Sequence, residues 1–280
     1  MEQILICTDL DRTLLPNGIQ PESPAARPLF RKLAVQPFVT VAYVSGRDFK
    51  LVRQAIEDFD LPDPDFMVGD VGTTIYHKSA DSWQNLPEWH EIIGRDWHGA
   101  TAGELAELLN GLPELELQEL EKQSRFKLSY YTDPETDSAI LKDKVRRRLA
   151  DCPVKIRFIF SVDEVNRIGL FDLLPEAASK LAAIKFLAAR TGVSSDRMIY
   201  AGDSGNDLEV LTSEVKAILV ANAIEAVKRQ AQQAAPANTL YLAQGNFMEM
   251  NGNYAAGLLE GLVHYLPELG GLFGSNFSET

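Results

Sequence analysis

Carboxylates follow two short apolar runs of the sequence. Asp9 and Asp11 come directly after residues 4–7, and Asp203 comes after residues 198–201. In extended backbone, a spacing of two points both side chains to the same side. Carboxylates held close together repel each other unless a cation lies between them. Because Mg²⁺ prefers oxygen ligands and also accepts a substrate phosphate oxygen, these three residues predict a magnesium site that handles a phosphorylated substrate.

Groups that could hold the phosphate lie elsewhere in the chain. Thr13 and Ser45 offer hydroxyl groups, Asn206 offers a side-chain amide, and Gly46 offers a backbone N–H. Such donors, and turns that precede helices, commonly bind phosphate. Lys180 stands at the start of a predicted helix and would balance the charge of the transferred phosphoryl group. We expect these five residues to form the phosphate site.

Together these groups predict phosphoryl transfer to an aspartate. Asp9 would attack phosphorus in line and form an aspartyl phosphate. Asp11 would protonate the leaving oxygen and then take a proton from the water that hydrolyses the intermediate, while Mg²⁺ shields Asp9 from the incoming phosphate. Each motif alone is more often a turn or a helix cap. Three such clusters after three apolar runs, with a lysine between them, favour an enzyme site.

The elements that must position these residues alternate between strand and helix. Short apolar runs predict buried, mostly parallel strands at 4–7, 38–44, 66–68, 198–201 and 217–220. Amphipathic patterns predict helices at 25–33, 49–59, 177–190, 224–233 and 255–265. Ligands of an open parallel sheet bind outside the carboxyl ends of its strands, where the polar clusters would meet. The predicted fold class is α/β, with a Rossmann-like parallel sheet.

A long segment interrupts this α/β pattern. Its two alternating strands flank a helix at 138–149, which is typical of a small α+β module with a mostly antiparallel sheet. A connection of this length is expected to fold by itself. We therefore predict a core domain of residues 1–78 and 168–280, with an inserted cap domain of residues 79–167.

The composition excludes several classes of partner. The 280 residues carry a formal net charge of -13, which repels nucleic acid and anionic membranes. A small anionic substrate remains compatible if a metal and a few cations act locally. The sequence shows no membrane-spanning stretch or leader, and Cys7 and Cys152 form no metal or redox motif. We expect a cytoplasmic protein; its oligomeric state stays open, and a monomer is compatible with the sequence.

The motifs resemble those of the haloacid dehalogenase (HAD) superfamily. The matching segments, in the superfamily's order, are Asp9-Leu10-Asp11-Arg12-Thr13, Ser45, Lys180 and Gly202-Asp203-Ser204-Gly205-Asn206-Asp207. The resemblance implies that Asp9 is the nucleophile and a Mg²⁺ ligand. It implies that Asp11 is the acid/base and binds the metal through its backbone carbonyl. Asp203 would bind Mg²⁺ as well, with Asp207 close behind it.

The position of the insert narrows the resemblance. It lies between Ser45 and Lys180, which is similar to the C2-capped, Cof-like branch, whose members mostly hydrolyse phosphorylated sugars. Within that branch, the chain most resembles sucrose-phosphate phosphatases, on segments 71–76, 127–131, 172–175 and 256–260. The match implies that Lys127 and Tyr130 of the cap help to hold the sugar. The family usually has a glycine directly after the motif lysine, but here Leu181 follows Lys180. Residues 176–179, just before that lysine, lack the arginine or glutamine that sucrose-phosphate phosphatases carry there. Whether sucrose 6-phosphate is the substrate therefore stays open.

Other interpretations stay open at this point. A sugar phosphomutase would use the same aspartate, although mutases usually carry their cap after the first motif. A non-catalytic protein could keep the HAD fold for binding, although the motifs are complete. Trp83, Trp89 and Trp97 could stack on a sugar ring or pack between the domains. Hydrolysis of a sugar phosphate is the expected activity, and the sugar stays open because cap side chains select it.

Overall fold

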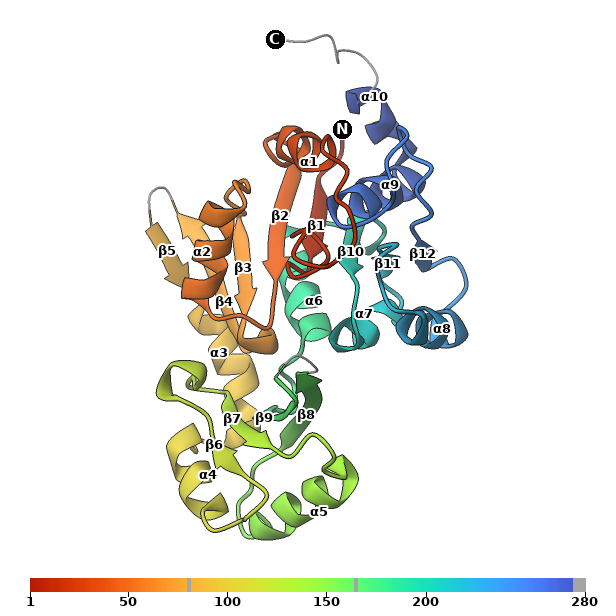
Figure 1. The fold of residues 1–280 in the computed structure, drawn as a ribbon. Coiled ribbons are helices and arrows are strands. Elements are labelled where there is room, and N and C mark those ends of the chain that lie inside the picture. Colours follow the sequence, from red (N-terminus) through yellow and green to blue (C-terminus); the bar gives the residue numbers. More distant parts are fainter. Residues whose placement is uncertain (80–81, 164–165, 274–280) are drawn as a thin grey trace.

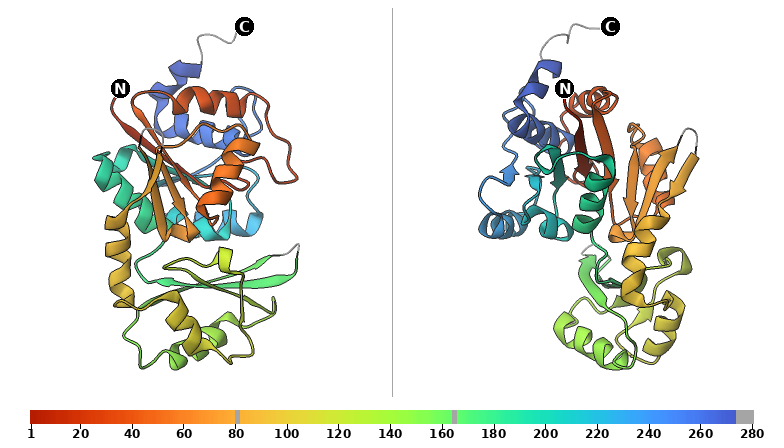
Figure 2. Two further views of the ribbon diagram at one scale, coloured as in Figure 1. Left: turned by 90° about the vertical axis from the view of Figure 1, so that its left-hand side faces the viewer. Right: turned by 180° about the vertical axis from the view of Figure 1, so that it is seen from behind.

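The computed structural model describes residues 1–79, 82–163 and 166–273. It contains two β-sheets, one above the other, with helices packed around both (Figure 1). The N-terminus and the last helices lie at the end of the molecule far from the smaller sheet (Figures 1 and 2). The smaller sheet is built entirely from the middle of the chain, which agrees with an insert in an α/β fold.

The larger sheet is mostly parallel. Its eight described strands are, in spatial order, β12 (Leu240–Leu242), β11 (Lys216–Leu219), β10 (Met198–Gly202), β1 (Ile4–Thr8), β2 (Val39–Val44), β3 (Phe66–Gly69), β4 (Thr74–Ser79) and β5 (Ser82–Asn85). The pairings from β12 to β3 are parallel, and β4 and β5 form an antiparallel hairpin at one edge. The predicted fold class is confirmed.

Helices cover both faces of the larger sheet because its strands are apolar on both sides. In β1, Ile4 and Ile6 pack with the helices of one face, whereas Leu5 and Cys7 pack with those of the other. The first face carries α1 (Ala26–Ala34), α2 (Phe49–Asp58) and α9 (Ala255–Tyr265). The second face carries α6 (Lys180–Thr191) and α7 (Leu208–Leu211), while α8 (Glu225–Ala234) packs near β11 and β12.

The smaller sheet is antiparallel and has helices on one side. Its strand order is β6 (Glu116–Leu117), β7 (Leu128–Thr132), β9 (Ile168–Pro175), β8 (Ile156–Asp163). The helices α4 (Ala102–Leu109) and α5 (Ser138–Arg148) lie on its far side, and α3 (Pro87–Gly94) connects the two parts (Figure 1). The remaining short helices are η1 (Asp70–Gly72), η2 (Arg95–Trp97), η3 (Leu120–Lys122), η4 (Ser195–Arg197), η5 (Gly205–Asp207), η6 (Pro267–Leu269) and α10 (Gly270–Phe273).

The sheets to which β5 and β9 belong differ from those that the predicted cap boundaries imply. The predicted cap, residues 79–167, would include β5 and leave out β9, but β5 pairs with β4 in the larger sheet and β9 pairs with β7 and β8 in the smaller one. An antiparallel edge hairpin has the same alternation as an antiparallel insert, so the sequence pattern does not separate them. We propose that the cap spans residues 86–175.

Helix α9 lies very close to the larger sheet. A Cβ atom added to Gly261 would lie 2.7 Å from both Cδ1 and Cγ2 of Ile218, a fully buried residue of β11. Real Cβ atoms do not approach other carbons so closely, and Ile218 has no free space to move into. Glycine is therefore required at this position by the distance between helix and sheet.

Gly261→Ala should lower the free energy of unfolding by about 1–3 kcal/mol, because the added methyl overpacks the interface between α9 and β11. Gly103→Ala in α4 is the matched control, since its Cβ would have no atom nearer than 3.9 Å. The control should leave stability unchanged or raise it by up to about 1 kcal/mol. Urea denaturation of both variants measures the difference, and equal stabilities would contradict the close packing of α9.

Candidate active site

The carboxyl ends of the central parallel strands open into a cavity of about 660 Å³ between the two sheets. In Figure 1, this edge of the larger sheet faces the smaller sheet. The cavity is lined from the core by Asp9, Asp11, Arg12, Gly46, Arg47, Asp48, Leu51, Asp70, Asp203, Ser204 and Asn206, and from the cap by Glu121, Lys122, Lys127 and Leu170. The predicted polar clusters therefore meet at one place.

Three carboxylates form the centre of the site. Asp9, Asp203 and Asp207 each offer an oxygen within 4.8 Å of the others, and all three residues are buried. Asp9 follows β1, and the other two follow β10, the parallel neighbour of β1. Parallel pairing brings the two strand ends together, which is why residues almost 200 positions apart share one site.

Lys180 ties these carboxylates together. Its Nζ donates hydrogen bonds to Asp9 Oδ1 at 3.1 Å, to Asp207 Oδ1 at 2.7 Å and to Asn206 Oδ1 at 2.9 Å. All three ammonium protons are thus used. The residue is the first of α6, and Ser179 caps the helix by accepting a hydrogen bond from Ala182 N.

The charges of this cluster shift one another's pKa values. Burial raises the pKa of Asp9 to about 8, against the opposing effect of Lys180 and with a further rise from the neighbouring carboxylates. Burial and the charge of Asp207 also raise the pKa of Asp203 to about 6. Burial alone would lower the pKa of Lys180, but Asp207 and Asp9 raise it above its ordinary value. Negative charge is therefore in excess at this site.

Asp207 is held in place more firmly than the other carboxylates. Besides Lys180, its oxygens accept hydrogen bonds from the Tyr200 hydroxyl at 2.5 Å and from the backbone N–H groups of Asp203 and Ser204, both at 3.0 Å. Burial alone would raise the pKa of Asp207, but Lys180 and these donors lower it below its ordinary value. A Cβ at Gly202 would lie 2.6 Å from Asp207 Cγ, so only glycine fits there. Asp207 does not line the cavity, and it fixes the position of the Lys180 ammonium from the side away from it.

Thr13 and Arg12 act on Asp203. The Thr13 hydroxyl donates to Asp203 Oδ1 at 3.2 Å, and Arg12 Nε lies 3.3 Å from Asp203 Oδ2. Thr13 is fully buried and does not line the cavity. The Thr13 hydroxyl is thus turned to the carboxylate of Asp203, and the phosphate contact predicted for Thr13 stays a prediction.

Asp11 lies apart from the other three carboxylates. Its oxygens accept hydrogen bonds from Arg47 Nε at 2.8 Å, Arg47 Nη2 at 2.6 Å and Asn17 Nδ2 at 2.6 Å. Its side chain thus lines the cavity but is not a member of the carboxylate group. Sequence reasoning missed Arg47, although it directly follows the predicted Ser45-Gly46 pair.

The other predicted phosphate residues lie at the same edge of the sheet. Ser45 and Gly46 follow β2, and Ser45 Oγ accepts a hydrogen bond from Arg47 N at 3.1 Å. Gly46 and Asn206 line the cavity, whereas Ser45 is almost fully buried beneath it. The individual roles of these residues toward a phosphate stay predictions.

The two predicted sugar contacts of the cap point in different directions. Lys127 lines the cavity that contains Asp9, and its Nζ lies 3.8 Å from Asp172 Oδ1. Tyr130 lies in β7 on the face that packs against the cap core, where it lines a separate hollow near α4. Because side chains alternate along a strand, Tyr130 points away from the cavity that contains Asp9, and the sugar contact predicted for it stays untested.

Sequence reasoning missed several residues that extend the cavity over the cap. A connected hollow of about 610 Å³ is lined by Gln118, Ser161, Leu170 and Asp172 together with Gly46 and Asn206 of the core. The face of the cap sheet that looks toward the core supplies these groups. Their signal in the sequence is weak, since single polar residues on alternate strand positions are common.

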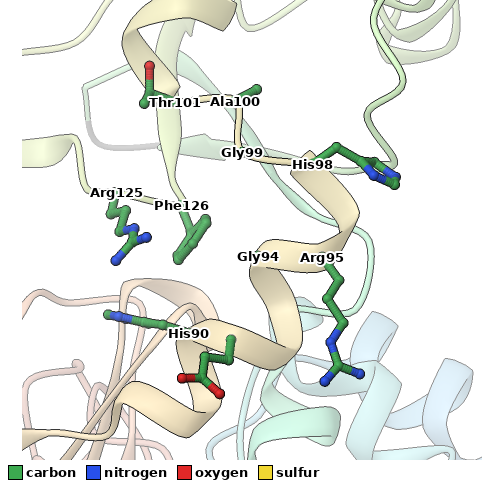
Figure 3. Close-up of a pocket in the computed structure, with 10 residues that line it drawn as sticks. His90, Gly94, Arg95, His98, Gly99, Ala100, Thr101, Arg125 and Phe126 are labelled. Carbon is green, nitrogen blue, oxygen red and sulfur yellow. The ribbon is translucent and has the colours of Figure 1, made fainter.

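Two of the three tryptophans pack in the interior, and Trp83 is half-buried on the edge strand β5. Trp89 and Trp97 are fully buried, and Trp83 packs against Phe49. A second cavity of about 530 Å³ lies beside α3 in the cap (Figure 3). In Figure 3, Arg95 and His98 extend away from Arg125, so its cationic groups do not converge. The cavity above Asp9 is the better candidate for the active site.

The donor set fits a hard divalent cation. Three buried carboxylates with one buried ammonium leave uncompensated negative charge, and such a group is stable when a cation neutralises it. Oxygen ligands favour Mg²⁺ or a similar ion. Asp9 and Asp203 would hold the ion directly, because the oxygens of Asp207 already accept several hydrogen bonds.

Comparison with known proteins identifies the family. A model of sucrose-6F-phosphate phosphohydrolase matches residues 2–266. The chain belongs to this family. It is therefore a HAD-fold phosphoric monoester hydrolase. None of the described helices is long and apolar enough to span a membrane.

Individual relatives agree with the family. A HAD-like hydrolase of Nitrosococcus oceani is 50% identical over 95% of this chain and 73% of its own length. The mannosylfructose-phosphate phosphatase of Agrobacterium fabrum is 25% identical over 93% of this chain and 96% of its own. A sucrose-phosphatase structure from Synechocystis, in complex with sucrose and phosphate, has a TM-score of 0.75 at 24% identity and covers 95% of this chain and 98% of that one; this similarity shows the fold.

The metal-free protein should lose stability as the pH rises from about 4 to 8. The pKa of Asp9 is about 8 in the folded protein against an ordinary value of 3.8. The folded state therefore binds more protons than the unfolded chain in this range, and its advantage disappears as Asp9 ionises. Melting temperatures with a chelator, at several pH values, measure the effect.

Asp9→Asn is the control for this prediction, because it removes the group with the largest shift and should reduce the pH dependence to the smaller part that the raised pKa of Asp203 contributes. Added Mg²⁺ should raise the melting temperature of the unaltered protein more at pH 8 than at pH 5, since an ionised carboxylate binds the cation. An identical pH slope in both proteins would show that Asp9 is not the group responsible.

Proposed function

We propose that the protein is a Mg²⁺-dependent phosphatase that hydrolyses a sugar phosphate through an aspartyl phosphate at Asp9. The observation that carries the proposal is the position of Asp9 beside Lys180, at the base of a cavity that the cap covers. Family membership adds weight, because relatives are named for sucrose phosphate and mannosylfructose phosphate. Both names describe disaccharide phosphates, so we propose a glycosyl phosphate of similar size.

The first chemical step is attack by Asp9 on phosphorus. An Asp9 oxygen forms the new P–O bond as the bond from phosphorus to the sugar oxygen breaks. Lys180 holds the nucleophile and its charge opposes that of the phosphoryl oxygens. A bound Mg²⁺ would supply charge neutralisation between the carboxylates and the phosphate.

Asp11 serves as acid and then as base. It lines the same cavity two residues after Asp9, and it would protonate the leaving sugar oxygen in the first step. In the second step it takes a proton from water, whose oxygen attacks phosphorus and releases Asp9. Arg47, which binds both oxygens of Asp11, orients this carboxylate.

The cap would recognise the sugar. Lys127, Gln118 and Asp172 offer donors and acceptors on the cap face above the core, and hydroxyl-rich ligands are selected by such fixed polar groups. The two connected hollows have volumes of about 660 Å³ and 610 Å³, which favours a substrate larger than one sugar ring. A cytoplasmic location accords with such a substrate and remains part of this proposal.

A phosphate-release screen tests the activity. The panel should contain sucrose 6-phosphate, mannosylfructose phosphate, other disaccharide phosphates and simple hexose phosphates, each with Mg²⁺ and with a chelator. The purified protein should release phosphate from a disaccharide phosphate only with the cation, and Asp9→Asn should lose at least about a thousandfold in kcat because it removes the nucleophile.

Asp11→Asn provides the internal control for the pathway. The change removes the acid of the first step and the base of the second, so turnover should fall, and mass spectrometry of acid-quenched protein should locate any trapped phosphate on Asp9. Recovery of an isomerised sugar phosphate in place of free phosphate would favour a mutase. Complete inactivity on the panel would contradict the proposed substrate class.

The sugar contact of Lys127 is tested by a matched pair. Lys127→Ala should raise KM for the preferred substrate about 10-fold or more with little change in kcat, because it removes a charged hydrogen-bond donor from ground and transition state alike. Tyr130→Phe should change neither value, since the Tyr130 hydroxyl has no hydrogen-bond partner among the described residues and lies outside this cavity. Steady-state kinetics decide, and equal effects of both changes would refute the assignment.

A further inference from the structure

Three consecutive residues between β3 and β4 have left-handed backbone conformations. The φ angles of Asp70, Val71 and Gly72 are 51°, 59° and 95°. A β-branched residue such as Val71 is rarely found there, because its side chain crowds the backbone. Backbone of this kind persists only where the surrounding structure holds it, and it gathers at functional sites. We call residues 70–72 the left-handed turn.

The left-handed turn is bonded to the segment that follows β2. Asp70 N donates to the carbonyl of Arg47 at 3.0 Å, and Val71 N donates to the carbonyl of Ser45 at 3.3 Å. Val71 also packs over Gly46, whose Cβ position lies 3.9 Å from Val71 Cγ2. The turn therefore fixes the backbone of the predicted phosphate segment from the side opposite to β1.

The left-handed turn also touches the start of α6. A Cβ at Gly72 would lie 2.5 Å from the carbonyl carbon of Ser179 and 2.9 Å from Lys180 N. The two backbones are thus in direct contact, and no side chain fits between them. Because Lys180 is the first residue of α6, the position of Gly72 determines where its side chain begins.

The cap segment holds the same turn. Trp89 of α3 donates from Nε1 to the carbonyl of Gly72 at 3.0 Å, and this contact is buried. The Trp89 ring also packs on Phe186 of α6, with ring centroids 5.2 Å apart. Helix α3 runs from the larger sheet down to the cap (Figure 2), and the Trp89 N–H links this helix directly to the turn.

We propose that the left-handed turn, with Trp89, is a positioning element that sets Lys180 and the Ser45-Gly46 backbone for catalysis and couples them to the cap. This inference rests on the proposed phosphatase function. A shift of α3 moves the Gly72 carbonyl, and with it the contact that places Lys180 beside Asp9. Trp89 and Gly72 touch no reacting atom and act only through Lys180 and Ser45.

A pair of tryptophan variants tests the coupling. Trp89→Phe removes the N–H donor and keeps most of the packing. Trp97→Phe is the matched control, since Trp97 is equally buried in the same segment but its Nε1 has no hydrogen-bond partner among the described residues. Relative to the control, Trp89→Phe should lower kcat about 10-fold, because a small displacement of a catalytic group is costly. Its KM and its inhibition constant for inorganic phosphate should both rise severalfold, because the same contact places the groups that would hold the phosphate, and the melting temperatures of the two variants should be similar.

A pair of glycine variants tests the contact with α6. Gly72→Ala introduces the clash with Ser179, and its φ is also positive. Gly99→Ala is the matched control, because Gly99 has a φ of 92° but no atom within 4 Å of its Cβ position. Both variants carry a similar backbone penalty, but only Gly72→Ala should lower kcat per folded molecule, by about 100-fold. The competitive inhibition constant of inorganic phosphate should weaken in parallel.

The outcomes separate this inference from the proposed function. If the unaltered protein hydrolyses a sugar phosphate and Trp89→Phe behaves like Trp97→Phe, the inference is overturned while the function stands. If the unaltered protein is inactive, the proposed function fails, and calorimetric binding of inorganic phosphate with Mg²⁺ then decides: equal affinities in Trp89→Phe and Trp97→Phe overturn the positioning role. If Gly72→Ala does not fold, the tryptophan pair alone decides.

Discussion

The contact between Lys180 and the carboxylates of Asp9 and Asp207 is the constraint on which the site depends. Lys180, Asp9 and Asp207 are each less than 5% exposed. Removing a charge from water costs several kcal/mol unless partners compensate it. Lys180 has three acceptors, and Asp207 accepts from Tyr200 and two backbone N–H groups. Much of the local sequence is therefore explained by the need to keep this ion cluster paired.

The same cluster bears on the proposed binding of a cation together with a phosphate. One buried ammonium faces three buried carboxylates, and Arg12, which pairs with Asp203, is 40% exposed. Such an excess of negative charge would attract a divalent cation, which in the proposed function would also accept an anionic phosphoryl group. The overall acidity of the chain repels large polyanions, whereas this local balance is compatible with a small anionic substrate.

The parallel core sheet and the antiparallel cap sheet contribute different residues to the cavity, because their strands are arranged differently. Parallel strands bring β1, β2 and β10 to one edge, so the core holds the proposed nucleophile and the predicted phosphate residues. The antiparallel cap sheet has one face packed on its helices and one face free to meet the core. Residues on the free face, such as Lys127 and Asp172, reach the cavity, whereas Tyr130 on the packed face does not.

The sequence alone determined the parallel α/β core, the insert and the main chemical groups, because apolar runs followed by polar motifs are local signals. Asp9 and Asp203 needed only the rule that neighbouring parallel strands end at the same edge of a sheet. The tertiary structure decided the rest. The partner of Asp11, the direction of Thr13 and Tyr130, and the contact of Gly72 with α6 depend on side-chain rotation and on packing between distant segments. Lys180 meets Asp9 across 171 positions of chain, and no local pattern encodes the geometry of such a meeting.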